Sequence, residues 1–270
     1  MKEQDAYILG TDQEELHRLG LQHQVWASEA HKGWELAGFT AGQTILDLGC
    51  GPGFCTKELA FVVGNSGKVI GIDRSEHFVN FLKQINNQYG LKIDAIQADF
   101  NDMVLEPNSL DGMYCRWAMA WIPNVKEVLS KVKIALKPGG KMVLHEYYDW
   151  QTHSVVPRKE GIEKAIAGCL QSFKEQEGEI DVGKELPRIF EDIGMKVTSK
   201  RLMAKLATPD NLNWHWPKSF YYSYFPRLAE AGYLTQTDVA QALKDFEALE
   251  KNKNATLFCP ILIEVIAEKL

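Results

Sequence analysis

The 270-residue chain lacks the features of a membrane or exported protein. No run of apolar residues approaches the length of about 18 that a membrane-spanning helix needs, so we expect no membrane span. The first sixteen residues, MKEQDAYILGTDQEEL, are polar and acidic and hold no apolar signal-peptide core. Internal repeats and low-complexity tracts are also missing. We therefore expect a cytoplasmic protein.

Cysteine patterns for disulfide bonds or metal sites are missing too. The five cysteines are an odd number, none form a CxxC pair, and the histidines do not fall at zinc-ligand spacing. These cysteines are Cys50, Cys55, Cys115, Cys169 and Cys259. We expect reduced thiols and no metal.

The chain also has no excess of basic over acidic residues. The chain has 30 Lys and Arg against 36 Asp and Glu, a net charge of −6, which argues against a nucleic-acid partner because phosphates attract clustered cations. Hydrophobic residues make up 45% and charged residues 24%, as in ordinary globular domains. The length suits one domain with insertions, and either a monomer or a homodimer is compatible with it.

The most informative feature present is the run ILDLGCGPGF at residues 45–54. Its apolar start predicts a buried strand, its three glycines predict a sharp turn, and the following TKELAFVV predicts a helix. Open α/β sheets build nucleotide sites from such a strand, glycine turn and helix. A carboxylate at Asp47, just before the turn, suits a ligand with an ammonium group and a sulfonium better than it suits a phosphate.

Similar units follow along the first 150 residues. The predicted strands are 44–48, 68–73, 92–99, 110–116 and 141–148, and the predicted helices are 11–38, 55–63, 75–89 and 124–136, the last closed by KPGG. Strands that alternate with helices predict an α/β fold with a doubly wound parallel sheet.

The pattern loosens after residue 150. We predict helices at 158–177 and 184–193, a strand at 196–206, a mostly helical segment at 208–250, and a last strand within 255–270. The chain is interpreted as one domain with four parts. These are an N-terminal helical cap at 1–40, a core at 41–150, and helical lid insertions at 151–183 and 207–254.

Polar and aromatic residues end the predicted parallel strands, where ligands bind in open α/β sheets. The strand ends carry Asp47 with Gly49, Asp73, Asp99 with Phe100, Arg116 with Trp117, and Glu146 with Tyr147. Asp73 can accept two ribose hydroxyls, Asp99 can accept a purine amino group, and Phe100 can lie against the purine ring. A nicotinamide or flavin site is the rival interpretation, but Phe54 stands where GxGxxG needs its third glycine.

These segments resemble the class I S-adenosylmethionine (SAM)-dependent methyltransferases. ILDLGCGPG resembles the glycine motif of that superfamily, VIGIDRS its ribose-binding strand, and QADF its adenine-contacting turn. LDGMYCRWAMAWIPN and LKPGGKMVLHEY resemble its fourth and fifth strand regions. The match covers residues 44–148 and is similar in particular to the branch with ubiquinone and menaquinone C-methyltransferases.

The resemblance implies a Rossmann-like, seven-stranded, mostly parallel sheet of order 3-2-1-4-5-7-6 with the last strand antiparallel. It also implies SAM as cofactor and a set of cofactor-binding residues. That set is Tyr7, Gln22, Asp47, Gly49, Cys50, Gly51, Gly53, Asp73, Arg74, Asp99, Phe100, Arg116 and Trp117.

Methyl transfer from a sulfonium is an in-line displacement that needs alignment, and a base when the acceptor holds a weakly acidic proton. Candidate bases near the fifth strand's end are Glu146, Tyr147 and His145. Strand alternation places Glu146 on one face and its two neighbours on the other. The alternative is that these side chains only pack.

A second aromatic cluster lies in the later insertion. Trp214, Trp216, Tyr221 and Tyr222 are candidates for a substrate pocket, with docking of the insertion as the alternative. We therefore predict a SAM-dependent methyltransferase acting on a small-molecule acceptor. A SAM-binding regulator without methyl transfer and a protein methyltransferase are the alternatives.

Overall fold

The computed structural model describes residues 13–175 and 177–270, which divide into two compact units. The sheet unit holds residues 26–148, 181–203 and 262–270, and the helical unit holds the described residues of 1–25, 149–180 and 204–261. Tyr7, a predicted cofactor contact, lies outside the described residues. No helix within the described ranges is both long and apolar enough to cross a membrane.

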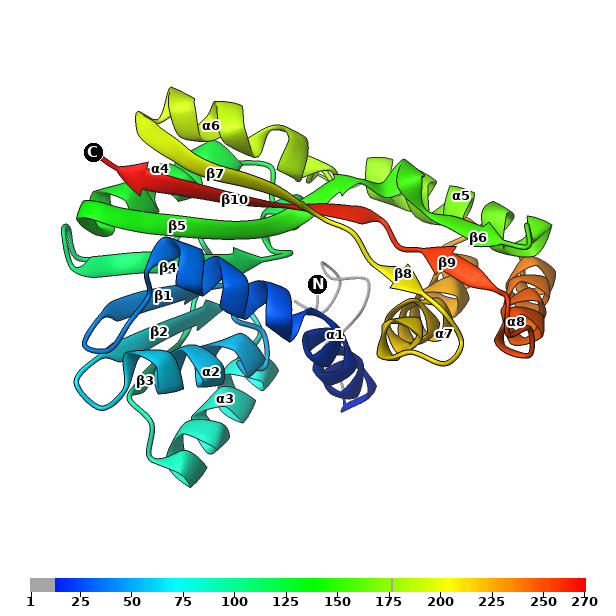
Figure 1. Cartoon of the computed structure of the whole chain (residues 1–270), viewed down its shortest axis with the longest axis horizontal. Coiled ribbons are helices and arrows are strands. Elements are labelled where there is room, and N and C mark those ends of the chain that lie inside the picture. The colour runs from blue at the N-terminus through cyan, green and yellow to red at the C-terminus, as the bar shows by residue number, and fades with distance from the viewer. Residues whose placement is uncertain (1–12, 176) are drawn as a thin grey trace. The chain divides into compact units, whose positions relative to one another are not determined.

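The sheet unit is built around seven strands in the order β3-β2-β1-β4-β5-β10-β7 (Figure 1). The strands are β1 Thr44–Leu48, β2 Lys68–Asp73, β3 Ile93–Gln97, β4 Leu110–Arg116, β5 Leu136–Asp149, β7 Met195–Met203 and β10 Ile261–Lys269. Strands β1 to β5 pair in parallel, and β10 runs antiparallel to β7. The predicted fold class and strand order are confirmed.

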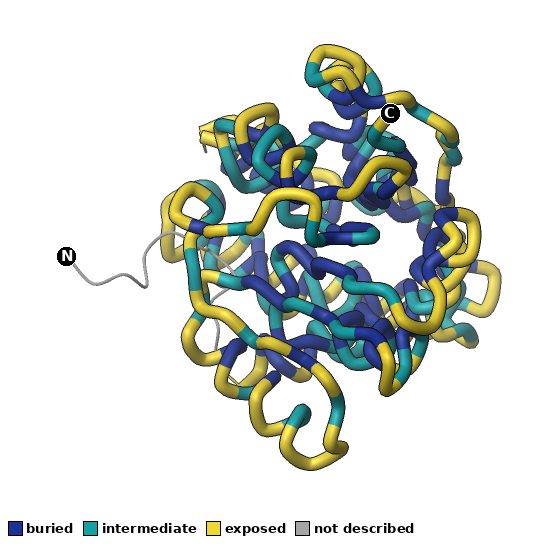
Figure 2. Tube along the Cα trace, turned by 90° about the vertical axis from the view of Figure 1, so that its left-hand side faces the viewer, coloured by how far each residue is buried: buried dark blue, intermediate teal, exposed yellow. Residues whose placement is uncertain are grey.

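Helices flank this sheet. They are α2 Phe54–Val63, α3 Glu76–Tyr89, α4 Val125–Ala135 and α6 Leu186–Asp192, joined by the second half of α1 Gln13–Ala37 and by the 3-10 turns η1 Met119–Trp121 and η3 Val182–Lys184. Ser75 caps α3 by accepting the Phe78 N–H, and Gly90 ends it in the left-handed conformation. The apolar faces of α2 and β1 meet in a core that includes Ile45, Leu59 and Val69. The central strands are dark blue in Figure 2, whereas loops and outer turns are exposed.

The helical unit combines α-helices with a small sheet. Its helices are α5 Glu160–Lys174, α7 His215–Glu230 and α8 Gln236–Glu250, which contact one another, and the first half of α1. The remaining elements are the 3-10 turns η2 Trp150–Thr152 and η4 Leu212–Trp214 and the strands β6 Ser154–Val156, β8 Leu206–Ala207 and β9 Thr256–Phe258. These three strands form an antiparallel sheet of order β6-β9-β8 that we did not predict from the sequence.

Two predicted boundaries are wrong for local reasons. Lys137–Gly140 does not simply end a helix but belongs to β5, whose first residue Leu136 pairs with Leu110. The expected strand 196–206 divides into β7 and β8, which belong to different sheets. The last strand predicted within 255–270 is β10, and Pro260, which has no N–H to donate to a ladder, stands between it and β9.

Candidate functional site

The glycine turn between β1 and α2 is the centre of the predicted site. Gly49, Gly51 and Gly53 all have positive φ, at 73°, 52° and 87°. A side chain built on Gly53 would collide with Leu82 of α3, so this glycine allows close helix packing. A Cβ built on Gly51 meets no atom within 4 Å, so open space lies beside its backbone. A ligand can therefore approach the turn at Gly51.

Asp73, the last residue of β2, lies against the same turn. Its Oδ2 accepts the Gly51 N–H at 2.8 Å and its Oδ1 accepts the Ser75 N–H at 2.8 Å. Burial raises the pKa of Asp73, while these two backbone bonds oppose the rise. A carboxylate has about four acceptor positions, so both oxygens retain capacity for ribose hydroxyls. The structure thus brings Gly51 and Asp73 together at the glycine turn.

Asp47 is buried at the glycine turn. It is 2% exposed, and its Oδ2 accepts the hydroxyl of Thr56, in the first turn of α2, at 2.6 Å. Burial raises its pKa to about 6, opposed by the Thr56 hydrogen bond and by the positive charge of Arg116 at the end of β4. Its observed contact therefore ties β1 to α2.

The remaining predicted cofactor residues of the sheet unit occupy different positions around this turn. Cys50 is buried, and its N–H donates to the Ile72 carbonyl of β2 at 3.0 Å. The ring of Phe100 lies 3.5 Å from a Cβ built on Gly49. Asp99 is exposed and accepts the Asn101 N–H at 2.8 Å, and Arg74 is exposed beside Asp73.

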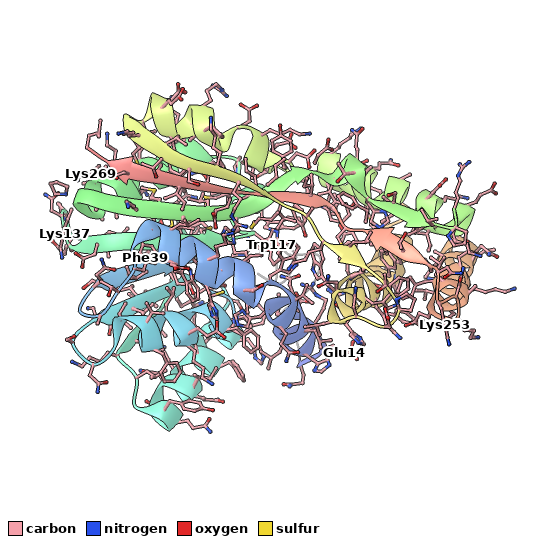
Figure 3. All side chains as sticks on the ribbon, in the orientation of Figure 1. Glu14, Phe39, Trp117, Lys137, Lys253 and Lys269 are labelled. Carbon is pink, nitrogen blue, oxygen red and sulfur yellow. The ribbon has the colours of Figure 1, made fainter. Side chains whose placement is uncertain are left out.

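The turn after β4 borders the glycine turn. A Cβ built on Gly49 would lie 2.5 Å from the Cβ of Ala118. Trp117, just before it, has a φ of 56°, which is rare for a bulky residue. Its ring stacks against Tyr147 at 5.9 Å and meets Trp26 edge-on at 5.7 Å. Figure 3 labels Trp117 at the end of β4, where the parallel strands finish.

His145 and Glu146, adjacent on β5, are both fully buried. His145 Nε2 lies 2.8 Å from Glu264 Oε2, and its Nδ1 lies 3.3 Å from the hydroxyl of Tyr114. Glu146 Oε1 accepts the backbone N–H groups of Ala118 at 3.0 Å and Met119 at 2.9 Å. Because both ring nitrogens of His145 have partners in the core, the geometry favours a structural role for it over the predicted role of base.

Two of the predicted pocket residues of the helical unit, Trp214 and Tyr221, pack against neighbouring aromatic rings. Trp214 is buried and stacks on Phe246 at 4.9 Å, and Tyr221 stacks on Phe225 at 4.6 Å. Tyr221 is also hydrogen-bonded to His153. These contacts agree with the packing alternative for both rings.

Two further predicted residues meet in the helical unit. The indole N–H of Trp216 donates to Gln22 Oε1 at 3.1 Å, and Arg18 donates to the same oxygen at 3.0 Å. Tyr222 differs from the other three rings because it is 41% exposed, with Lys218 near its face. It is the member of the predicted set whose ring is open to solvent.

A groove of about 500 Å³ lies elsewhere on the sheet unit, between α1 and α2. Its lining includes the rings of Trp34, Phe39 and Phe61 and the carboxylates of Glu35 and Glu58. No predicted site residue lines it, so it is separate from the glycine turn.

Comparison with known proteins assigns the family. A family model described as a methyltransferase domain matches residues 39–194, more than half of the chain. The chain belongs to this methyltransferase family, and the resemblance seen in the sequence is confirmed.

Curated relatives match parts of the chain. It is 26% identical to sterol 24-C-methyltransferase from Saccharomyces cerevisiae over 202 residues, which cover 72% of this chain and 49% of that protein. It is 33% identical to demethylmenaquinone methyltransferase from Lactococcus lactis over 126 residues, which cover 46% of this chain and 49% of that protein. The chain spans about half the length of these relatives.

Solved structures match over more of the chain. Geranyl diphosphate C-methyltransferase from Streptomyces coelicolor matches with a TM-score of 0.58 and 14% identity, covering 92% of this chain and 77% of that one. The cyclase SpnF matches with a TM-score of 0.58 and 16% identity, covering 90% and 80%. These matches show the fold alone, and a cyclase among them means that the fold does not decide the reaction.

Proposed function

We propose that this protein is a SAM-dependent methyltransferase that acts on a small-molecule acceptor. The observation that carries the proposal is the open space at Gly51, whose N–H is held by the Asp73 carboxylate from the next strand. This arrangement suits a ribose-bearing ligand that lies against bare backbone and offers hydroxyls to a carboxylate. Family membership supports methyl transfer as the chemistry.

The residues present fit SAM. Gly51 gives room for the nucleoside, Asp73 accepts its ribose hydroxyls, and Phe100 lies beside Gly49 where a purine can stack. SAM, when bound, supplies the methyl group on a positively charged sulfur. The negative net charge of the chain and the carboxylates at the strand ends are compatible with that cationic ligand.

The chain's own contribution is alignment. Displacement at a methyl carbon requires donor, carbon and acceptor in line, so rigid walls matter more than strong acids. The packed rings of Trp26, Trp117 and Tyr147 supply such a wall at the end of β4. A base among Glu146, Tyr147 and His145 remains a prediction.

We infer that the acceptor carries an extended apolar body. The relatives named above act, by their names, on sterols, demethylmenaquinone and geranyl diphosphate, which share isoprenoid chemistry. Aromatic residues are abundant in the helical unit, and the exposed Tyr222 is our candidate for acceptor contact there. A cytoplasmic monomer or homodimer without nucleic-acid partners stays our expectation, and light scattering of the purified protein tests the oligomeric part.

The test of the cofactor is calorimetric titration of SAM, S-adenosylhomocysteine and NAD into the purified protein. We expect saturable binding of the two sulfur nucleotides and none of NAD. The Asp73→Ala variant should bind them more than about tenfold more weakly, because a charge-assisted hydrogen bond contributes about 1.5–3 kcal/mol. Glu76→Ala, on the helix that follows, is the matched control and should bind like the wild type. Binding of NAD alone would overturn the proposal.

A further inference from the structure

Burial alone does not explain the hydrogen bonds that the Glu146 side chain makes. The side chain is 0% exposed, and one oxygen, Oε1, accepts two backbone N–H groups in succession, those of Ala118 and Met119. The other oxygen, Oε2, is buried and has no hydrogen-bond partner among residues 13–175 and 177–270. Oε1 therefore makes both hydrogen bonds described for this side chain, and the backbone N–H of Ala120 also acts to lower its pKa.

The two N–H groups belong to the turn that follows β4. They open the 3-10 turn η1, and Ala118, its N-cap, offers no side-chain acceptor for them. Free N–H groups at a buried turn are costly, so an acceptor from another strand is required. Glu146 of β5 supplies it across the sheet edge.

This turn is also backbone-strained. Trp117 adopts a left-handed φ of 56°, a conformation that costs about 1–3 kcal/mol for a residue other than glycine. Its N–H donates to the His145 carbonyl at 3.0 Å, and its ring is held between Tyr147 and Trp26. The strain persists because the contacts on both sides of Trp117 fix the chain.

The Trp117–Met119 turn contacts the glycine turn directly. Ala118 lies against Gly49, where even a methyl group on the glycine would collide with the Ala118 Cβ. A shift of Ala118 thus changes the wall of the proposed nucleoside site, although Glu146 itself lies beneath that wall in the core.

We propose that Glu146 is a positioning residue, not a base: its Oε1 holds the Trp117–Met119 turn in its strained form, so that Ala118 closes one side of the cofactor site at Gly49. This inference rests on the proposed function and refines one of its candidate bases. Burial raises the pKa of Glu146 to about 8, and the backbone N–H groups of the turn oppose that rise.

The test compares Glu146→Gln with Glu146→Leu, using S-adenosylhomocysteine as the titrated ligand. Glutamine keeps a carbonyl oxygen for the two N–H groups and cannot act as a base, whereas leucine removes the acceptor at similar size. We expect the Gln variant to bind within about threefold of the wild type and the Leu variant to bind at least about tenfold more weakly. Hydrogen exchange of the Ala118 and Met119 amides should be faster in the Leu variant only.

Other outcomes overturn the proposal. Wild-type affinity and slow exchange in the Leu variant would show that the turn needs no anchor, and equal weakening in both variants would show that the carboxyl proton or charge matters. If the Leu variant does not fold, Glu146→Asp replaces it. Its side chain is one methylene shorter, and we expect the same weakening of S-adenosylhomocysteine binding. If the wild type binds no S-adenosylhomocysteine, the proposed function fails, and amide exchange alone still decides whether Glu146 anchors the turn.

Discussion

The two faces of β5 bury ionisable side chains in contrasting surroundings. On one face, His145 pairs with Glu264 of β10, which in turn accepts Arg201 of β7 at 3.1 and 3.0 Å. On the other face, Glu146 meets only backbone N–H groups among its recorded contacts. Both side chains are fully buried, so the difference between them comes from the partners that each face supplies.

The pKa directions follow these partners. Burial alone would raise the pKa of Glu264, but the bonds from His145 and Arg201 outweigh it and lower the pKa. Burial lowers the pKa of His145, so its ring is neutral at pH 7, donates from Nε2 to Glu264 and accepts at Nδ1 from Tyr114. Among the described residues, no cation offsets the burial of Glu146, and its pKa rises to about 8. The cationic partner Arg201 therefore distinguishes Glu264 from Glu146.

The largest expected effect is the change of the free energy of unfolding with pH that Glu146 causes. Its pKa is higher in the folded chain, at about 8, than the ordinary 4.5, so the folded state binds its proton more tightly. The free energy of unfolding should therefore fall as pH rises from about 4.5 to about 8, with a slope of about 1.4 kcal/mol per pH unit from this group. Glu146→Gln should remove that slope. Urea unfolding at four pH values in this range measures it, and identical slopes in both proteins would contradict the prediction.

The second-largest effect on stability concerns the face of β5 that carries His145. Glu264→Leu removes the carboxylate that pairs with His145 and Arg201, and should lower the free energy of unfolding by about 3 kcal/mol, because Arg201 loses one of its counterions and His145 loses its hydrogen-bond acceptor. Glu268→Gln, on the same strand and partly exposed, is the matched control and should change stability by less than about 0.5 kcal/mol. Urea unfolding at pH 7 compares them. A loss below about 1 kcal/mol for Glu264→Leu would mean that the network contributes little.

The smallest effect tests the outer end of the same network. Tyr114→Phe removes the hydroxyl that lies 3.3 Å from His145 Nδ1 but keeps the ring contact with Trp34 at 5.4 Å. We expect a loss of about 0.5–1 kcal/mol in the free energy of unfolding, the usual size for one neutral hydrogen bond. Tyr89→Phe, half-exposed on α3, should show no change. A larger loss than that of Glu264→Leu would reverse the order of importance within the network.

The sequence predicted the sheet and the glycine turn well because both depend on local signals. Apolar runs of five to seven residues became β1, β2 and β4 with the expected bounds. Gly49, Gly51 and Gly53 all took the positive φ that such a turn requires. Alternation along β5 also placed His145 and Glu146 on opposite faces.

The sequence could not predict what those two side chains touch. Glu264 lies 119 residues from His145, and Ala118 lies 28 residues from Glu146, so both contacts depend on how the strands are ordered in the sheet. The small β6-β9-β8 sheet was missed for the same reason, since its strands hold two or three residues each and carry no pattern alone. The strain at Trp117 is likewise a property of the folded turn.

The most direct test of the account is titration of S-adenosylhomocysteine into the wild type and into Gly51→Val. The structure places open space beside Gly51, and a valine there would fill it and oppose the left-handed backbone. We predict saturable binding by the wild type and none by a folded Gly51→Val variant. Equal binding by both proteins would contradict the placement of the cofactor at this turn, and absence of binding by the wild type would contradict the proposed function.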